Sequence, residues 1–442
     1  MQPIEPVFVD YKKDMSQFEA QPGIDVLYKK NETNDIFTLI YVFNTGTEND
    51  PALNLAFNYL SYLGTDKMTA EEIASEMYDI ACSFYMNAGA NQSSIQITGL
   101  SENMGKAMEI VEGLIAGAKP DEAILENCKA DMLKSRADAK LNQSRCFGAL
   151  QRYLFYGGDF IRRTTLTDPA LQALTSEQLL AKIGGLMGKQ HEVLYYGPQK
   201  ETEIKSALAE HHKVAADLQP LEKKFSALLP TDANKVVLAQ YDAKQLYYLQ
   251  FSNRGEKFDV AADPEITLYN EYFGGGMNTI VFQEMREARG LAYSAWATLA
   301  TPSNANGDYS YYAFIATQND KMQKAVEAFD DIINNMPESE KAFGIAKEAL
   351  VSRLRTERTV KDGVLWSYLR ARDLGLDAPR DKQIFEKVQS MTLDDVKAAQ
   401  QKWVKGRKYV YGILGDIQDL DLNYLKTLGP IQTVSQEEIF GY

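Results

Sequence analysis

Hydrophobic and polar positions along the chain follow a strand-like alternation and then a helix-like period, in an order that occurs twice. The segment SSIQITGLSENMGKAMEIVEGLIAGAKP (93–120) alternates, turns at polar residues, and then repeats its apolar positions every three to four residues. YSYYAFIATQNDKMQKAVEAFDDIINNMP (309–337) has the same plan, with Ser101 corresponding to Thr317 at an offset of 216 residues. Each segment predicts a strand, a polar turn and an amphipathic helix that ends near a proline.

Two further pairs of segments keep nearly the same offset. LTSEQLLAKIGGLMGKQHEVLYYGP (174–198) and MTLDDVKAAQQKWVKGRKYVYGILGD (391–416) both predict a capped helix followed by a strand, and Thr175 corresponds to Thr392 at 217 residues. DIFTLIYVFNTG (35–46) and KQLYYLQFSNRG (244–255) both alternate and end in a turn that contains Asn and Gly. Three pairs in one order indicate an internal duplication.

The duplication predicts two tandem repeats of one α+β fold. We place the first repeat at 1–212 and the second at 234–442. The intervening residues 213–233 mix charge and two prolines with little strand pattern, which is typical of a linker. In each repeat we expect an antiparallel-rich sheet covered by helices on one face.

Composition narrows the possible partners. The chain has 442 residues, 45% hydrophobic and 24% charged, as in ordinary globular proteins. Its net charge of −14 argues against nucleic acid as a partner. No apolar run is long enough to span a membrane, and MQPIEPVFVDYKKD has no apolar leader stretch. We therefore expect either that the protein stays where it is made or that a leader lies outside this sequence. The expected location is the cytoplasm or the periplasm.

The residues that usually carry hydrolytic chemistry are sparse. Three cysteines lack any Cys-x-x-Cys spacing and are expected to be buried thiols. The histidines His191, His211 and His212 form no His-x-x-Glu-His motif, and we expect them at the surface or in turns. The glycine run 274–276 has no following Gly-Lys-Ser/Thr and predicts a tight turn that opens a helix. Nothing in the chain activates water on its own.

One segment nevertheless resembles a known family. YNEYFGGGMNTIVFQEMREARGLAYSAWA, in the second repeat of a duplicated α+β unit, closely resembles the pitrilysin-type zinc peptidases, which include insulin-degrading enzyme and the mitochondrial processing peptidase. The resemblance covers almost the whole chain and is strongest at R-E-x-R-G-L-A-Y. It implies a half-clamshell built from two LuxS/metallohydrolase-like repeats. In this family one half carries zinc, and the second half closes a chamber and supplies an arginine and a tyrosine.

The resemblance places the family's zinc ligands on residues that do not bind zinc. LAFNYLSYLGTDKMTAEEI (55–73) corresponds to the zinc-motif segment, so the two histidines fall on Leu55 and Tyr59 and the catalytic glutamate falls on Asn58. A third ligand, a glutamate of a downstream helix, falls on Ser135. Since none of these side chains is a usual zinc ligand, the first repeat is expected to be a degenerate zinc-site domain with no metal in this chain.

The arginine and tyrosine, in contrast, are both present. Arg286 and Tyr293 keep the family spacing of seven residues. The segment NTIVFQEMREA predicts a helix that ends near Arg289 and Gly290, and AYSAWATLA predicts a strand that returns Tyr293 towards the last helical turn. Through the resemblance, Arg286 is expected to hydrogen-bond peptide carbonyls and Tyr293 to stabilise an oxyanion.

These observations predict the non-metal member of a zinc peptidase. The chain is expected to pair with a zinc-bearing homologous subunit, or to be the C-terminal half of a longer polypeptide, and to contribute Arg286 and Tyr293 to peptide hydrolysis in trans. Alone it is expected not to cleave peptides. Two alternatives remain: a structural scaffold of the same family, and a peptide-binding module with no role in hydrolysis. The retained pair of Arg286 and Tyr293 argues against a pure scaffold.

Overall fold

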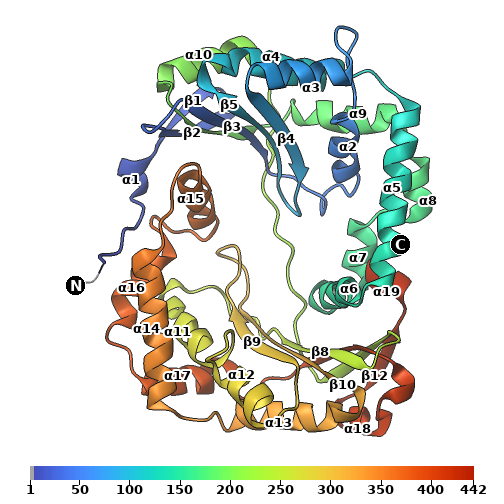
Figure 1. Ribbon diagram of the computed structural model, residues 1–442, viewed down its shortest axis with the longest axis vertical. Helices are drawn as coiled ribbons and strands as arrows, with labels where there is room; N and C mark the ends of the chain where they lie inside the picture. The colour runs from blue at the N-terminus through green and yellow to red at the C-terminus, as the bar shows by residue number, and fades with distance from the viewer. Residues whose placement is uncertain (1–3) are drawn as a thin grey trace.

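A computed structural model describes residues 4–442 of the chain. The two halves face each other, one above the other, with their sheets towards the centre (Figure 1). Each half contains one six-stranded sheet. The strands of the first half are β1 (Ser16–Gln21), β2 (Ile24–Lys30), β3 (Ile36–Phe43), β4 (Cys82–Ala88), β5 (Ser93–Leu100) and β6 (His191–Gly197). Those of the second half are β7 (Lys235–Gln240), β8 (Gln245–Ser252), β9 (Ser294–Ala300), β10 (Ser310–Gln318), β11 (Val410–Gly415) and β12 (Ile431–Val434).

Helices fill the intervals between the strands. In the first half they are α1 (Tyr11–Asp14), α2 (Leu53–Leu60), α3 (Ala70–Asp79), α4 (Met104–Gly117), α5 (Glu122–Leu141), α6 (Gln143–Tyr156), α7 (Gly158–Thr164), α8 (Asp168–Ala173), α9 (Ser176–Leu186) and α10 (Glu201–His211), with the short helix η1 (Ser101–Asn103). In the second half they are α11 (Asp263–Phe273), α12 (Ile280–Phe282), α13 (Met322–Asn334), α14 (Glu340–Thr356), α15 (Gly363–Asp373), α16 (Arg380–Val388), α17 (Leu393–Ala399), α18 (Leu422–Leu428) and α19 (Gln436–Phe440). Shorter helical segments there are η2 (Val260–Ala262), η3 (Gln283–Ala288), η4 (Asn319–Lys321), η5 (Gln400–Val404) and η6 (Ile417–Asp419).

The two sheets share one topology over five strands. Their orders are β1-β2-β6-β3-β5-β4 and β12-β7-β11-β8-β10-β9, so that β2, β6, β3, β5 and β4 correspond to β7, β11, β8, β10 and β9. Most neighbours are antiparallel; β2 with β6, β7 with β11 and β12 with β7 are parallel. The predicted α+β class and antiparallel-rich sheets are therefore confirmed. The sixth strand differs, because β1 comes from the start of the chain and β12 from near its end.

The three pairs of sequence segments occupy equivalent places. β5 and α4 match β10 and α13, and β3 matches β8. Thr175 and Thr392 each cap a helix through a reciprocal capping box, with Gln178 in α9 and Asp395 in α17. Between α10 and β7, residues 212–234 form no helix or strand beyond an isolated bridge of Gln219 to Lys189.

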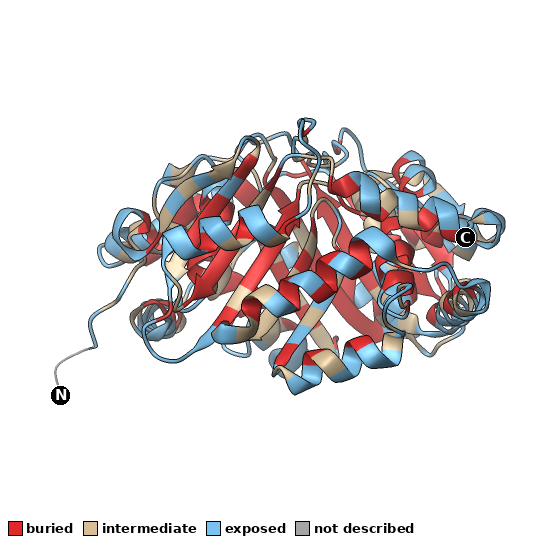
Figure 2. Ribbon diagram, turned by 90° about the horizontal axis from the view of Figure 1, so that it is seen from above, coloured by how far each residue is buried: buried red, intermediate tan, exposed pale blue. Residues whose placement is uncertain are grey.

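Each sheet is covered on its second face by a helix of the other half, which differs from the expected single covered face. Helix α6 of the first half contributes Phe147 and Leu150 to a cluster with Leu249 and Leu414 of the second sheet. Helix α15 of the second half packs in the same way on the inner face of the first sheet (Figure 1). Buried residues accordingly concentrate in the sheets and on the helix sides that face them (Figure 2). The exchange of helices joins the two halves through apolar surface.

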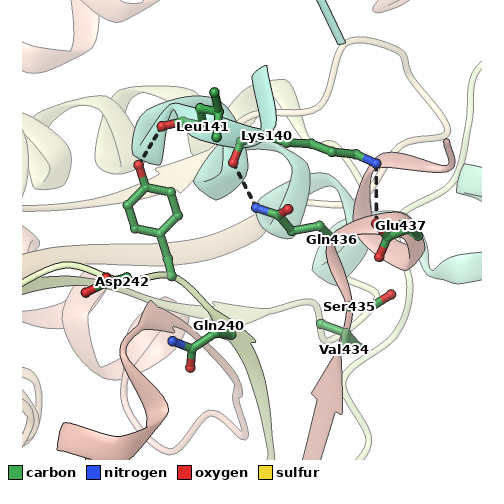
Figure 3. A pocket seen from close by; sticks show the side chains of 9 residues that line it. Lys140, Leu141, Gln240, Asp242, Val434, Ser435, Gln436 and Glu437 are labelled. Atoms are coloured by element: carbon green, nitrogen blue, oxygen red, sulfur yellow. Dashed lines mark hydrogen bonds and ion pairs between the residues drawn. The ribbon is translucent and has the colours of Figure 1, made fainter. Parts of the chain in front are cut away.

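Polar contacts reinforce this joint where α5 ends. The Tyr241 hydroxyl donates to the Leu141 carbonyl over 2.7 Å, and the Gln436 amide donates to the Lys140 carbonyl over 2.8 Å (Figure 3). The Lys140 ammonium lies 3.4 Å from the Glu437 carboxylate. These residues line a surface pocket between the first half and the C-terminal strand and helix. The pocket does not include Arg286 or Tyr293.

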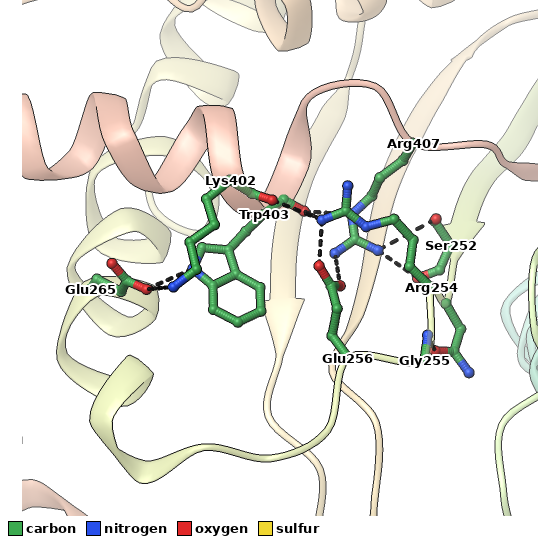
Figure 4. Close-up of polar contacts among 9 residues, drawn as sticks. Ser252, Arg254, Gly255, Glu256, Glu265, Lys402, Trp403 and Arg407 are labelled. Carbon is green, nitrogen blue, oxygen red and sulfur yellow. Dashed lines mark hydrogen bonds and ion pairs between the residues drawn. The ribbon is translucent and has the colours of Figure 1, made fainter.

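A buried arginine fixes the loop that leads from β8 to α11. The side chain of Arg407 lies 2.6 Å from the Glu256 carboxylate, and its Nη1 donates to the Ser252 carbonyl over 3.4 Å (Figure 4). Glu265 in the first turn of α11 accepts a hydrogen bond of 2.8 Å from the Trp403 indole. Because these contacts satisfy a charge that is removed from water, they hold α11 and the strands beside it in place.

Candidate functional site

Arg286 and Tyr293 lie on consecutive elements at the edge of the second sheet. Arg286 belongs to η3, a π-helical segment that continues α12, where the sequence predicted one ordinary helix. The helix ends as predicted at Gly290, whose φ of +57° is a left-handed conformation that glycine adopts readily. Tyr293 precedes β9, and its backbone N–H donates to the Ala316 carbonyl over 2.8 Å. The turn therefore folds the tyrosine back beside the helix.

The structure brings the two side chains together. The guanidinium carbon of Arg286 lies 5.7 Å from the centre of the Tyr293 ring and 5.1 Å from the centre of the Phe282 ring. Both distances are in the range of cation–π contacts, so the rings orient the guanidinium. Arg286 is 46% exposed and Tyr293 is 71% exposed. Both side chains can therefore reach a molecule outside the chain.

Arg286 has a nearby carboxylate but no hydrogen bond to one within the described residues. Within residues 4–442, the carboxylate found within 4.0 Å of Arg286 is that of Glu287, at 3.8 Å from Nε. This distance is too long for a hydrogen bond. The hydrogen-bond donors of the guanidinium thus point to solvent, where they can bind carbonyl or carboxylate oxygens.

A close backbone approach fixes β9, the strand that follows Tyr293. The Ala297 N–H of β9 donates to the Gly274 carbonyl over 2.9 Å. A Cβ at Gly274 would lie 1.9 Å from the Ala297 carbonyl oxygen, so only glycine fits there. The run 274–276 therefore forms a turn, as predicted, and its first glycine also permits contact between the end of α11 and β9.

The four positions that correspond to the family's zinc site do not fit a metal ion. Leu55 and Tyr59 are fully buried in α2. The Tyr59 hydroxyl donates to Ser176 Oγ over 2.8 Å and accepts from the Asp121 N–H over 2.9 Å, so it fixes helices to each other. Asn58 and Ser135 are exposed on α2 and α5. These residues offer neither imidazole nor carboxylate, which are the ligands that zinc requires here.

No substitute metal site is found elsewhere in the described part of the chain. Across residues 4–442, no group of three or more His, Cys, Asp or Glu side chains is arranged to hold a metal ion. The three cysteines are free and buried, as predicted.

The prediction that the histidines lie at the surface or in turns was wrong for two of them. His191 and His212 are buried, at 4% and 5% exposure, between the first sheet and its helices. Nδ1 of His191 lies 2.7 Å from the Lys189 carbonyl, and Nε2 lies 2.8 Å from Nε2 of His212. Nδ1 of His212 lies 2.5 Å from the Glu112 carboxylate. The three side chains form one buried hydrogen-bonded row.

Hydrogen-bond geometry assigns the protons of this row. A carbonyl only accepts, so His191 carries its proton on Nδ1 and its Nε2 accepts from the N–H of His212. One proton then lies between His212 and the Glu112 carboxyl group. Burial first, and then the neighbouring His212, lower the pKa of His191 to about 4. His191 is therefore neutral in the folded protein, and the row contributes to stability.

A comparison with protein families matches the part of the chain that contains this pair. Residues 191–350, which include Arg286 and Tyr293, match the family model described as the peptidase M16 inactive domain. The chain is related to the M16 peptidases through their inactive domain. This relation confirms the resemblance drawn from the R-E-x-R-G-L-A-Y segment.

Several relatives and solved structures agree with this result. An uncharacterised zinc protease of Streptomyces coelicolor is 22% identical over 266 residues, which cover 56% of each chain. The peptidase M16 inactive domain from Pseudomonas fluorescens has a TM-score of 0.70 at 18% identity, over 91% of this chain and 98% of that one. The periplasmic protease PqqL from Escherichia coli has a TM-score of 0.71 at 13% identity, over 93% of this chain and 46% of that one.

The matches differ in how much of each relative they cover. The chain spans about half the length of the first curated relative and of PqqL, and nearly all of the inactive domain from Pseudomonas. At this identity the structural matches establish the fold, with its two repeat-like halves. They also agree with an M16 inactive domain that resembles one half of a protease. No helix in residues 4–442 is long and apolar enough to cross a membrane.

Proposed function

We propose that this M16 inactive domain is the non-metal half of a zinc peptidase and supplies Arg286 and Tyr293 to peptide bound by a zinc-bearing half. The observation that carries the proposal is the exposed stack of Arg286 on Tyr293, in which Arg286 makes no hydrogen bond to a carboxylate of residues 4–442. A scaffold gains little from two such side chains. The zinc-bearing half is either a separate subunit or the N-terminal half of a longer polypeptide.

In this assembly the two side chains have separate tasks. The Arg286 guanidinium donates hydrogen bonds to peptide carbonyl oxygens and so orients the substrate. The Tyr293 hydroxyl donates to the oxygen on which negative charge develops as the peptide bond is attacked. The activation of water falls to the zinc-bearing half, since the residues at 55, 58, 59 and 135 do not fit a metal ion.

Reconstitution with the zinc-bearing homologue of the source organism tests the proposal. Tyr293→Phe keeps the ring that stacks on Arg286 and removes only the hydroxyl, so kcat should fall about 100- to 1,000-fold. Arg286→Ala should raise KM and lower kcat. Both positions are exposed, so the free energy of unfolding should change by no more than about 0.5 kcal/mol, and assembly should persist.

Tyr78→Phe is the matched control, because Tyr78 is also highly exposed but lies on α3. It should leave kcat and KM unchanged. Hydrolysis at the original rate by Tyr293→Phe and Arg286→Ala would refute the proposal and favour the scaffold alternative. The mass of the native gene product distinguishes a separate subunit from half of a longer polypeptide.

A further inference from the structure

The two sheets differ at the edge strands that occupy equivalent places, β4 in the first and β9 in the second. The strand register shows the equivalence. In the first sheet, Tyr41 of β3 pairs with Ile95 of β5, which pairs with Met86 of β4. In the second sheet, Gln250 of β8 pairs with Ala313 of β10, which pairs with Ala297 of β9. Tyr41 and Gln250 correspond in the duplicated segments 35–46 and 244–255. Met86 and Ala297 are therefore the same position in the two repeats, as are Ala88 and Leu299.

The outer edge of β9 is closed by the chain itself. The N–H of Ala297 donates to the Gly274 carbonyl, and the N–H of Leu299 donates to Asn270 Oδ1, each over 2.9 Å. The Asn270 amide also donates to the Leu299 carbonyl over 2.9 Å. The Asn270 side chain thus replaces a neighbouring strand, and Ala297 and Leu299 are fully buried.

The outer edge of β4 has no such closure. The N–H of Leu100 donates to the Ala81 carbonyl and the N–H of Gly89 to the Gln92 carbonyl, so the odd-numbered residues of this strand face β5. The backbone groups of Phe84, Met86 and Ala88 therefore face outwards. Within the described residues 4–442, none of these outward groups has a hydrogen-bond partner beyond β5.

Nothing in the sequence of β4 blunts this open edge. Natural sheets usually protect an edge strand with charge, proline or a bulge. The strand CSFYMNA (82–88) has no charged residue and no proline, and it pairs with β5 without a register shift. Ser83, Tyr85 and Asn87 are exposed, with Tyr85 at 64%. An open, regular and uncharged edge is a template for another extended chain.

We propose that an extended segment of the peptide substrate adds to the outer edge of β4 as a further strand. The unpaired N–H and C=O groups of Phe84 and Met86 recognise peptide backbone, which is common to all sequences, and Tyr85 offers an aromatic surface to a side chain of the peptide. The role of the occupant as substrate rests on the proposed function. Binding itself needs neither Arg286 nor Tyr293.

Hydrogen exchange on the isolated chain tests the asymmetry of the edges. The amide of Met86 should exchange much faster than those of Ala297 and Leu299, measured residue by residue by NMR or by fragmentation mass spectrometry. Equal protection at both edges would overturn the proposal, because it would mean that the edge of β4 is closed.

Binding of a defined probe tests the occupant. The probe is fluorescein-labelled SSIQITGL, the sequence of β5, which already pairs with the inner edge of β4. Fluorescence anisotropy should show saturable binding, and the probe should slow exchange at Met86. A probe N-methylated at alternate residues loses the donors on one edge, so it should bind at least about tenfold more weakly.

Met86→Pro tests the edge from the side of the protein. Its N–H faces outwards, so proline leaves the ladder with β5 intact but removes a donor and places its ring in the path of the peptide. The dissociation constant should rise at least about tenfold. Met86→Leu keeps the N–H and should bind as the unchanged chain does.

Each outcome decides the proposal. If Met86→Pro fails to fold, the N-methylated probe still distinguishes backbone addition from other binding. Equal binding of the two probes, no binding, or dimerisation through β4 that excludes the probe would each overturn it. Arg286→Ala and Tyr293→Phe should bind the probe normally, so failure of the proposed function and failure of the edge are separable.

Discussion

The buried row of His191, His212 and Glu112 makes the stability of the protein depend on pH. The folded-state pKa of His191 is about 4, whereas the ordinary value is 6.5. Below pH 6.5 the unfolded chain therefore takes up a proton that the folded chain does not. The stability that His191 contributes is complete above pH 6.5 and is lost as the pH falls towards 4.

The size of the effect follows from the same two values. A shift from 6.5 to about 4, at about 1.4 kcal/mol for each pH unit, gives about 3–4 kcal/mol in the free energy of unfolding. His191→Gln removes the titrating group while its amide oxygen can still accept from His212. Between pH 6.5 and 4 the unfolding free energy of this variant should fall less steeply with decreasing pH than that of the unchanged chain. The two slopes should differ by about 1.4 kcal/mol per pH unit.

Urea unfolding followed by circular dichroism at pH 7.5, 6.0, 5.0 and 4.5 measures the difference. His211→Gln is the matched control. His211 is the last residue of α10 and precedes His212, but it is only partly buried and lies outside the row. This control shows whether a change from histidine to glutamine outside the row alters the profile by itself. Parallel profiles for His191→Gln and the unchanged chain would refute the assignment of a neutral, buried His191.

Three further outcomes follow from the described geometry. Tyr59→Phe removes a buried hydroxyl bonded to Ser176 and should lower the free energy of unfolding by about 1–2 kcal/mol in urea titration. Gly274→Ala places a Cβ against the Ala297 carbonyl and should lower the free energy of unfolding by about 1–3 kcal/mol. Gly276→Ala, which has open space around the new Cβ, should be nearly neutral. Equal midpoints of thermal unfolding for the two variants would contradict this. Elemental analysis of the purified chain should find no stoichiometric zinc, and one tightly held ion would overturn the assignment of the degenerate zinc positions.

Much of the fold is readable from the sequence because both repeats follow regular periods. Segments 35–46 and 244–255 are short, largely apolar runs that end in a turn containing Asn and Gly, and they form β3 and β8. The sequence does not reveal which sheet a helix covers. Helix α6 is amphipathic, but its period only indicates that one face is buried, and nothing local shows that Phe147 packs on the other half. Tertiary packing decides that exchange.

Local details at the site were harder to predict. The π-helical turn at 283–288 has an ordinary helical pattern, so its change of hydrogen bonding carries no sequence signal. The burial of His191 did have a signal. In HEVLYYG, His191 alternates with Val193 and Tyr195, and this places it on the same buried face of β6. Its partners Glu112 and His212 are distant in sequence, so the row itself was not predictable.

The closure of β9 and the position of Tyr293 are consequences of the same contacts. Gly274 and Asn270 hold the edge of β9 rigidly, and Tyr293 begins the chain segment that enters this strand. A rigid edge suits a side chain that must meet a reacting group within a fraction of an ångström, because positional error weakens such contacts steeply. It also excludes peptide from that edge. In the equivalent strand β4, no such hydrogen bonds close the outer edge, and this is where we propose that peptide adds. Under the two proposals, the duplication lets one repeat position the pair of Arg286 and Tyr293 and the other bind backbone, two tasks that a single edge strand could not combine.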